Sequence, residues 1–237
     1  MAAREPQLPP PVHAGLDDTI LDYWMARVAQ HERDWYMGVR LLKFPEDLRV
    51  YEHLLWLSRA SVVIEIGARF GGSALWFRDR LRTLRSYGLI DDVKVISIDI
   101  EPDLARGGVV AADPRSDGIE VIGGDVTDPG LPARVAQLVP DGASCLVVED
   151  SAHVYETTRA ALEGFSRFVR PGGFFIVEDG CVDVEELRLR PDWPRGVLPA
   201  LHDWLATGQG QAFTVRDDLE LYGISCHPSG FLQRLKE

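Results

Sequence analysis

The amino-acid sequence predicts a doubly wound, Rossmann-like α/β fold with a mostly parallel sheet, a closing antiparallel hairpin and an N-terminal helical extension. Short segments rich in Val and Ile alternate with segments of helical periodicity, and glycine or acidic residues follow these strands. The first two strands are separated by about 30 residues, the length of one βαβ unit. A chain of 237 residues, 46% of them hydrophobic, suits one domain with a substantial core.

Three parts are expected along the chain. Residues 1–15 are rich in Pro and lack periodicity, which predicts a disordered arm. Residues 16–58 form the helical extension, with one helix over residues 19–31 and a second that follows Pro45. The extension could cover a site, contact another subunit or simply lead into the fold. Residues 59–237 form the main domain.

The composition excludes several classes of protein. A net charge of -12 argues against a nucleic-acid partner, because phosphate backbones are bound by clustered Lys and Arg. Cys145, Cys181 and Cys226 are widely spaced without a C-x-x-C motif, so their spacing indicates neither a disulfide framework nor a zinc site. No apolar run reaches the length of a membrane span, and residues 1–11 lack the blocks of a signal peptide. We expect a cytoplasmic protein.

The stretch from Val62 to Ser73 predicts a strand, a tight loop and a helix that Ser73 caps. The loop glycines, which include Gly67 and Gly71, would let backbone N–H groups approach a nucleotide-like ligand near the positive helix end. Arg69 replaces the second glycine of a dinucleotide fingerprint. Glu65 would repel a phosphate, and S-adenosylmethionine, which is cationic, fits better. The alternative is that these glycines only turn the chain.

The next two strands supply further candidate cofactor ligands. Asp99 ends the strand over residues 93–99, where a carboxylate can accept both ribose hydroxyls of an adenosine. Asp125 follows the strand over residues 119–122 and could accept the adenine amino group. A helix cap or a turn is the alternative role of Asp99.

The fourth and fifth strands, over residues 145–150 and 174–177, supply a candidate metal site. Asp150 ends one strand, and Glu178 and Asp179 follow the other. Because neighbouring parallel strands end at the same sheet edge, these carboxylates should converge there. A hard cation such as Mg²⁺ suits them. The alternative is that one or more of them caps a helix or faces solvent.

His153 lies three residues after Asp150, on the expected first turn of the following helix. A histidine titrates near neutral pH and could remove a proton from a metal-bound hydroxyl, so His153 and Asp150 are the candidate catalytic residues. A structural role is the alternative for a lone histidine.

The remaining segments complete the predicted fold. Residues 181–196 lack clean periodicity and suggest a substrate loop, in which the arginines and Trp193 could face the acceptor. A helix from Val197 to Leu205 follows, and then strands over residues 212–216 and 220–225 predict an antiparallel hairpin. Five parallel strands followed by a hairpin form the pattern of a class I methyltransferase sheet.

The motifs in order resemble the cephalosporin hydroxylase family, which is built as S-adenosylmethionine-dependent methyltransferases. They read Glu-Ile-Gly-x-x-x-Gly-Gly-Ser, Ile-Asp-Ile, Gly-Asp, Glu-Asp-Ser-Ala-His and Pro-Gly-Gly-Phe-Phe-Ile-Val-Glu-Asp. The likeness runs from about Trp35 to Leu232, and Arg69 and Phe70 depart from it in a loop where members vary. The Asp-x-x-His and Glu-Asp pattern is also similar to metal-dependent macrolide-sugar O-methyltransferases. That resemblance implies Mg²⁺ at Asp150, Glu178 and Asp179, with His153 as base.

These observations predict an S-adenosylmethionine- and Mg²⁺-dependent O-methyltransferase that acts on a hydroxyl of a small natural product, a sugar or polyol. Residues 59–237 would be its methyltransferase domain. We expect a homo-oligomer with a small-molecule acceptor and no membrane partner. Two alternatives remain: an iron-dependent hydroxylase, although the chain lacks the His-x-Asp of a facial triad, and a cofactor-binding partner subunit without turnover.

Overall fold

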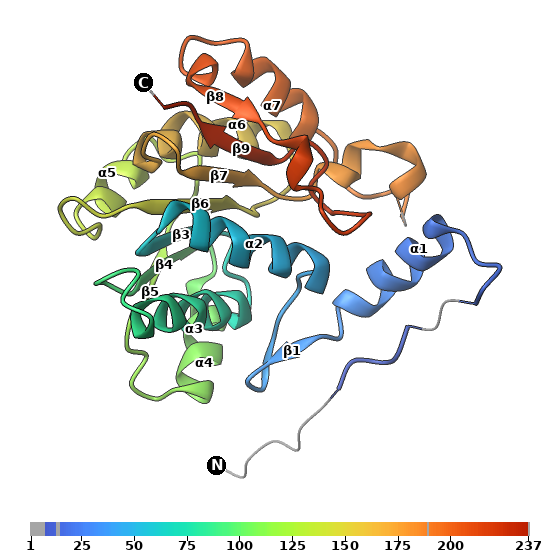
Figure 1. The fold of residues 1–237 in the computed structure, drawn as a ribbon, viewed down its shortest axis with the longest axis horizontal. Coiled ribbons are helices and arrows are strands. Elements are labelled where there is room, and N and C mark those ends of the chain that lie inside the picture. The colour runs from blue at the N-terminus through green and yellow to red at the C-terminus, as the bar shows by residue number, and fades with distance from the viewer. Residues whose placement is uncertain (1–7, 13–14, 189, 237) are drawn as a thin grey trace.

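The computed structural model describes residues 8–12, 15–188 and 190–236. A seven-stranded sheet lies at the centre of the molecule in the order β5-β4-β3-β6-β7-β9-β8, with helices on both faces (Figure 1). Strands β3 to β7 run parallel, and β9 is antiparallel to both β7 and β8. The predicted doubly wound, mostly parallel fold is confirmed. Much of the predicted arm, residues 1–7 and 13–14, lies outside the described residues.

The strands of this sheet are β3 (Val62–Ile66), β4 (Lys94–Asp99), β5 (Ile119–Gly123), β6 (Cys145–Glu149), β7 (Phe174–Val177), β8 (Phe213–Val215) and β9 (Phe231–Arg234). The first strand of the fold, β3, pairs with both β4 and β6, so the chain reverses its winding direction there. In doubly wound sheets the carboxyl ends of the strands at such a switch point form the ligand crevice.

The helices described are α1 (Ile20–His31), α2 (Pro45–Ser58), α3 (Gly72–Ser86), α4 (Pro102–Ala112), α5 (Leu131–Ala136), α6 (Tyr155–Phe165) and α7 (Val197–Leu205). Short 3-10 helices lie at Ser166–Phe168, Gly180–Asp183 (η2), Glu185–Leu187 (η3), Gly210–Ala212 and Asp217–Leu219. Among the described residues, no helix combines the length and the apolar character that crossing a membrane requires.

Two apolar cores cover the two faces of the sheet. Successive residues of β3 point to opposite faces, so Ile64 packs with residues of α6 and α7, whereas Val63 packs with residues of α2 and α3. All five residues of β3 and all five of β6 are buried, which explains their near-continuous apolar runs. The sheet is therefore a rigid base whose strand ends hold the functional side chains.

The N-terminal extension packs against the main domain. Thr19 and Asp22 form a capping box at the start of α1. Trp24 of α1 is fully buried, and its indole N–H donates to the carbonyl of Leu187 at 2.9 Å. A two-stranded hairpin, β1 (Trp35–Tyr36) and β2 (Val39–Arg40), then leads to α2. The two predicted helices of the extension are confirmed.

The predicted closing hairpin is only half right. The antiparallel pair exists, but its second strand is β9 (Phe231–Arg234), not residues 220–225. Residues 220–225 form no strand, and Leu221 and Tyr222 are exposed. Because β9 lies between β7 and β8 with both faces covered, only a segment with consecutive apolar residues suits it, and Phe231 and Leu232 are 1% and 0% exposed.

Candidate active site

A cavity of about 440 Å³ lies where β3, β4, β5 and β6 end. Of the residues predicted to bind the cofactor, Gly67, Ser73, Asp99 and Asp125 line it, together with the predicted metal or base residues Asp150, His153 and Asp179. Most of the predicted site residues therefore lie together at one edge of the sheet, as expected for residues that follow parallel strands.

The loop after β3 is shaped by close approaches within the protein. Gly67 has a φ of +100°, and a Cβ atom there would lie 1.8 Å from the carbonyl oxygen of Asp150. Gly71 caps α3 with a φ of +83°, and a Cβ there would lie 2.7 Å from the carbonyl oxygen of Ala105. The backbone N–H groups of Gly67 and Gly71 donate to protein carbonyls. Ser73 lies inside α3 and is not its N-cap, because the chain already turns at Gly71.

Asp99 and Asp125 project from the ends of β4 and β5 in hydrogen-bonded conformations. Asp99 accepts the backbone N–H groups of Arg69 and Glu101, both at 2.8 Å. The hydroxyl of Thr127 donates to Asp125 at 2.7 Å, and this bond lowers the pKa of Asp125. These hydrogen bonds orient both carboxylates at the wall of the cavity.

Glu65 does not line the cavity. Its side chain is fully buried, and it accepts a hydrogen bond from the hydroxyl of Ser97. Burial raises the pKa of Glu65, although the nearby Lys43 ammonium opposes this. Glu65 therefore lies behind the loop that carries Gly67, rather than at a position where a ligand in the cavity would touch it directly.

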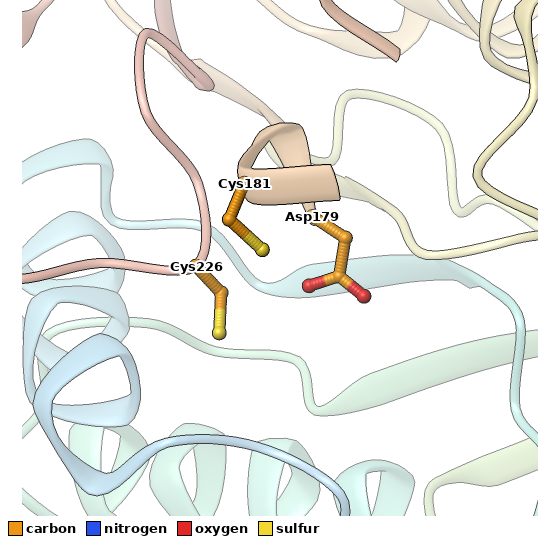
Figure 2. Close-up of side chains that lie close together, drawn as sticks. All are labelled: Asp179, Cys181 and Cys226. Carbon is orange, nitrogen blue, oxygen red and sulfur yellow. The ribbon is translucent and has the colours of Figure 1, made fainter. Parts of the chain in front are cut away.

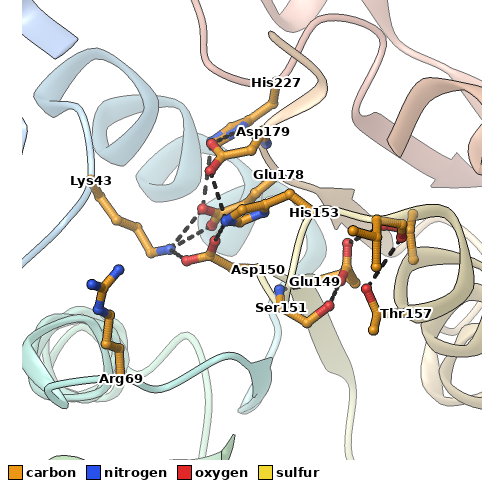
Figure 3. A network of polar contacts seen from close by, with 12 residues as sticks. Lys43, Arg69, Glu149, Asp150, Ser151, His153, Thr157, Glu178, Asp179 and His227 are labelled. Carbon is orange, nitrogen blue, oxygen red and sulfur yellow. Dashed lines mark hydrogen bonds and ion pairs between the residues drawn. The ribbon is translucent and has the colours of Figure 1, made fainter. Parts of the chain in front are cut away.

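Asp150, His153 and Asp179 form a compact cluster on one side of the cavity (Figure 3). The Nε2 atom of His153 lies 3.4 Å from Oδ2 of Asp179 and 4.0 Å from Oδ1 of Asp150. His153 has a φ of +57° and precedes α6, which begins at Tyr155, so its predicted place on the first helical turn is wrong. The left-handed backbone directs the imidazole back toward the two carboxylates.

Charges in this cluster shift one another's pKa values. Burial and the neighbouring Glu178 raise the pKa of Asp150 to about 7. For His153, burial lowers the pKa, but the carboxylates of Asp179 and Asp150 outweigh burial and raise it above 6.5. For Asp179, burial raises the pKa, but the neighbouring His153 outweighs burial and lowers it. The carboxylates of the cluster therefore repel one another and favour a positive charge beside them.

Glu178 points away from the first cavity, into a buried network. It is 2% exposed, and both of its oxygens accept from Nζ of Lys43 at 2.8 Å. The hydroxyl of Tyr51 donates to Oε1 of Glu178 at 2.6 Å. Lys43 also donates to Asp150 at 2.8 Å, so its ammonium joins two of the three predicted metal ligands (Figure 3).

Lys43 belongs to the candidate site, and the sequence analysis did not single it out. It is 5% exposed, and although burial lowers its pKa, the carboxylates of Asp150, Glu178 and Glu65 raise that pKa well above the ordinary value. One signal could have revealed it. A single lysine in the apolar run from Leu41 to Phe44 has to meet a buried partner of opposite charge.

His227 supports Asp179 and Glu178 from behind. Its Nδ1 accepts the backbone N–H of Asp179 at 3.0 Å, and its Nε2 lies 2.9 Å from the hydroxyl of Tyr51. A neutral His227 must therefore carry its proton on Nε2. Asp47, which is 1% exposed, lies 3.6 Å from that same nitrogen. The residues after β7 are thus fixed by the segment before β9 and by α2.

A second cavity of about 210 Å³ adjoins the first. His31, Leu42, Lys43, Arg69, His153 and Asp179 line both cavities. Arg190 and Trp193 of the predicted substrate loop line the second one. Arg188 does not face it: this side chain is 8% exposed and donates to the carbonyls of Pro191 and Trp193, because the loop folds around it.

Comparisons with known proteins show which proteins this chain resembles. The sequence profile of the family described as Rhamnosyl O-methyltransferase/CmcI matches residues 28–235. A rhamnosyl O-methyltransferase of Mycobacterium leprae (strain TN) is 28% identical over 64% of this chain and 67% of its own length. One from Mycobacterium tuberculosis (strain ATCC 25618 / H37Rv) is 25% identical over 62% of this chain, and the match spans 57% of that relative.

Solved structures with the same fold include two of CmcI. An apo structure is 25% identical and has a TM-score of 0.62, covering 98% of this chain and 91% of that one. A second, with Mg and SAM, is 23% identical with a TM-score of 0.59, over 96% and 89% of the two chains. The resemblance drawn from the motifs is confirmed. Because the profile spans nearly all of the chain, this protein belongs to the rhamnosyl O-methyltransferase/CmcI family.

Proposed function

We propose that this protein is an S-adenosylmethionine- and Mg²⁺-dependent O-methyltransferase that acts on a hydroxyl of a small sugar-like or polyol acceptor. One observation carries the proposal: the cluster of Asp150, His153 and Asp179 lies at the junction of two cavities. The larger cavity offers ligands for a nucleoside, and the smaller one holds room for an acceptor. Methyl transfer needs both molecules to meet at one point.

The larger cavity fits the cofactor. Asp99 can accept ribose hydroxyls with the lone pairs that Arg69 and Glu101 leave free, and Asp125 stands one strand further, near the adenine position. Gly67 and Ser73 contribute to the wall. We assign Glu65 and Gly71 to shaping this wall from behind. A CmcI structure of the same fold holds SAM together with Mg.

The carboxylates fit a hard divalent cation. Asp150 and Asp179 present oxygens to one point, and Asp179 also groups with Glu178 and His227. We propose Asp150 and Asp179 as ligands at the cavity, with Glu178 as the third. Because Lys43 bonds to both Asp150 and Glu178, an ion shared by all three carboxylates would have to displace the Lys43 ammonium. When bound there, Mg²⁺ supplies a Lewis acid that lowers the pKa of an acceptor hydroxyl.

His153 is the proposed general base. Its Nε2 faces the carboxylate cluster, and its Nδ1 is buried without a hydrogen-bond partner among the described residues. Its side chain lines both cavities, so the imidazole can take a proton from a hydroxyl placed between them. Asp179 holds the ring in that orientation.

The acceptor class rests on the relatives. Proteins named rhamnosyl O-methyltransferase match this chain, and Arg190 and Trp193 give the second cavity a charged and an aromatic wall that suit a hydroxyl-rich ring. The hydroxylase alternative is disfavoured, since no metal-competent cluster of the described residues combines two histidines with a carboxylate.

Labelled S-adenosylmethionine and a panel of glycosylated acceptors test the proposal. Label should reach an acceptor oxygen, chelation should abolish transfer, and added Mg²⁺ should restore it while calorimetry shows the cofactor still bound after chelation. Transfer that survives exhaustive chelation would refute the metal assignment.

Asp99→Ala should weaken cofactor binding by about 2 to 3 kcal/mol, roughly 30- to 150-fold. Asp103→Ala, an exposed control on α4, should not change cofactor binding.

A further inference from the structure

Two cysteines and an aspartate meet beside the candidate active site. One oxygen of Asp179 and the sulfur atoms of Cys181 and Cys226 all lie within 4.8 Å of one another. Figure 2 shows that the two sulfurs come from different segments, Cys181 from η2 directly after β7 and Cys226 from the strand-free segment before β9. All three cysteines of the chain are free thiols.

The backbone fixes this arrangement. The N–H of Cys181 donates to the carbonyl of Cys226 at 3.1 Å, so the two Cα positions are held side by side. The N–H of Cys226 donates to the buried carboxylate of Asp47, also at 3.1 Å. These two hydrogen bonds hold the backbone of Cys226 beside Cys181, so the two side chains start from fixed positions.

An ion can reach the pair. Cys181 is 3% exposed and Cys226 is partly exposed, and both line the second cavity together with Asp179. Nothing in the proposed transfer reaction uses either sulfur. Both side chains pack against the apolar core, but their sulfurs also lie in a cavity wall with a carboxylate oxygen beside them, an arrangement that suits a metal site.

The chemistry of the donors selects the ion. Two sulfurs and one carboxylate oxygen leave a fourth tetrahedral position for water, which suits Zn²⁺ or Cd²⁺ and not Mg²⁺. A bound metal must displace the protons of both thiols, and only an ion with high affinity for thiolate does so.

We propose that Asp179, Cys181 and Cys226 form a binding site for a thiophilic divalent cation such as Zn²⁺. Binding forms two metal–sulfur bonds and releases the two thiol protons to solvent. The site draws on Asp179, which the proposed function assigns to Mg²⁺. One consequence rests on the proposed function. If Asp179 also binds Mg²⁺, thiophilic ions and Mg²⁺ compete for its carboxylate, and a bound thiophilic ion inhibits methyl transfer.

Cd²⁺ is the probe, because its bonds to thiolate give a charge-transfer absorption in the ultraviolet. Titration of the reduced full-length protein, without cofactor or acceptor, should give a band that saturates at one Cd²⁺ per chain. Cys181→Ser and Cys226→Ser should each halve the band and weaken binding by roughly tenfold or more. Cys145→Ser is the matched control: Cys145 is a buried thiol on β6 outside the cluster, and its loss should change nothing.

Two outcomes overturn the site: no saturable band in the wild-type chain, or an equal loss in Cys145→Ser. Circular dichroism of Cys181→Ser and Cys226→Ser shows whether either variant fails to fold. If one does, the Cd²⁺ titration of the folded variant tests the site. Mg²⁺ should weaken Cd²⁺ binding through Asp179. A Cd²⁺ band that Mg²⁺ leaves unchanged overturns the sharing of Asp179. Methyl transfer assayed without Cd²⁺ tests the proposed function separately.

Discussion

At the scale of single residues, the candidate site depends on how neighbouring charges set the state of one histidine. The Nε2 atom of His153 lies 3.4 Å from the carboxylate of Asp179 and 4.0 Å from that of Asp150. Lys43 forms ion pairs with Asp150 and Glu178. The carboxylates that would hold a cation therefore also raise the pKa of His153. The contribution of His153 to turnover and its pKa can be measured in separate experiments.

His153→Ala should leave cofactor binding unchanged and lower turnover by roughly 10² to 10⁴, the usual contribution of a general base. Turnover should recover partly at higher pH, where a metal-activated hydroxyl ionises without help. His202→Ala, on the exposed side of α7, is the control and should keep full turnover. Full turnover of the His153 variant at neutral pH would assign this residue a structural role.

The pKa of His153 gives a second prediction. In the metal-free protein it lies above 6.5, because the carboxylates of Asp179 and Asp150 outweigh burial. The stability that protonated His153 contributes is therefore complete below pH 6.5 and is lost as the pH rises through the raised folded value. Asp179→Asn and added Mg²⁺ should each lower this pKa, measured by NMR titration of the ring. A pKa that neither change affects would contradict the cluster geometry.

At the scale of elements, the loop between β3 and α3 is built so that two strand ends can lie against each other. Gly67 faces the carbonyl of Asp150, and Gly71 faces that of Ala105 on α4. The glycines thus allow β3 to approach β6 and α3 to approach α4, and the cavity forms beside these contacts. Their sequence spacing resembles a ligand loop, although protein backbone fills the space nearest to them.

Gly67→Ala should destabilise the protein by about 2 kcal/mol or more, because it adds a Cβ at positive φ against a fixed carbonyl. Gly107→Ala is the matched control within α4: its Cβ would meet nothing within 4 Å, and it should stabilise the protein by about 0.5 to 1 kcal/mol. Urea denaturation measures both. Similar small effects at the two positions would show that the loop relaxes away from Asp150.

At the scale of the whole molecule, a buried charge network joins the N-terminal extension to the sheet. Lys43 precedes α2, and its ammonium meets the carboxylates that follow β6 and β7. Tyr51 of α2 and His227 near β9 bond to the same network. The extension therefore contributes to both the stability of the main domain and the wall of each cavity.

Lys43→Met should cost about 3 to 5 kcal/mol of unfolding free energy, because it leaves two carboxylates unpaired in a buried site. Lys94→Met is the control: Lys94 pairs with Glu120 near the surface at 3.1 Å, and its loss should cost at most about 1 kcal/mol. Denaturant unfolding monitored by tryptophan fluorescence compares them. An equally small loss for both variants would mean that Asp150 and Glu178 stay protonated and need no counter-charge.

The sequence by itself determined the parallel strands, their helices and most of the carboxylates of the site. Strand and helix periods are local signals, and the ends of parallel strands meet at one edge whatever the loops do, so Asp99, Asp150 and Asp179 could be placed in advance. The family resemblance rests on the same local motifs.

Only the tertiary structure decided the contacts between distant segments. Residues 220–225 carry a strand-like pattern, yet burial on both faces selects Phe231 and Leu232 for β9. Lys43 meets Glu178 across 135 positions of sequence, and Cys181 meets Cys226 although their spacing fits no metal motif. The packing of the layers determines these pairs. The charge or the sulfur atom of a side chain determines which kind of partner it can bind, but not which distant segment carries that partner.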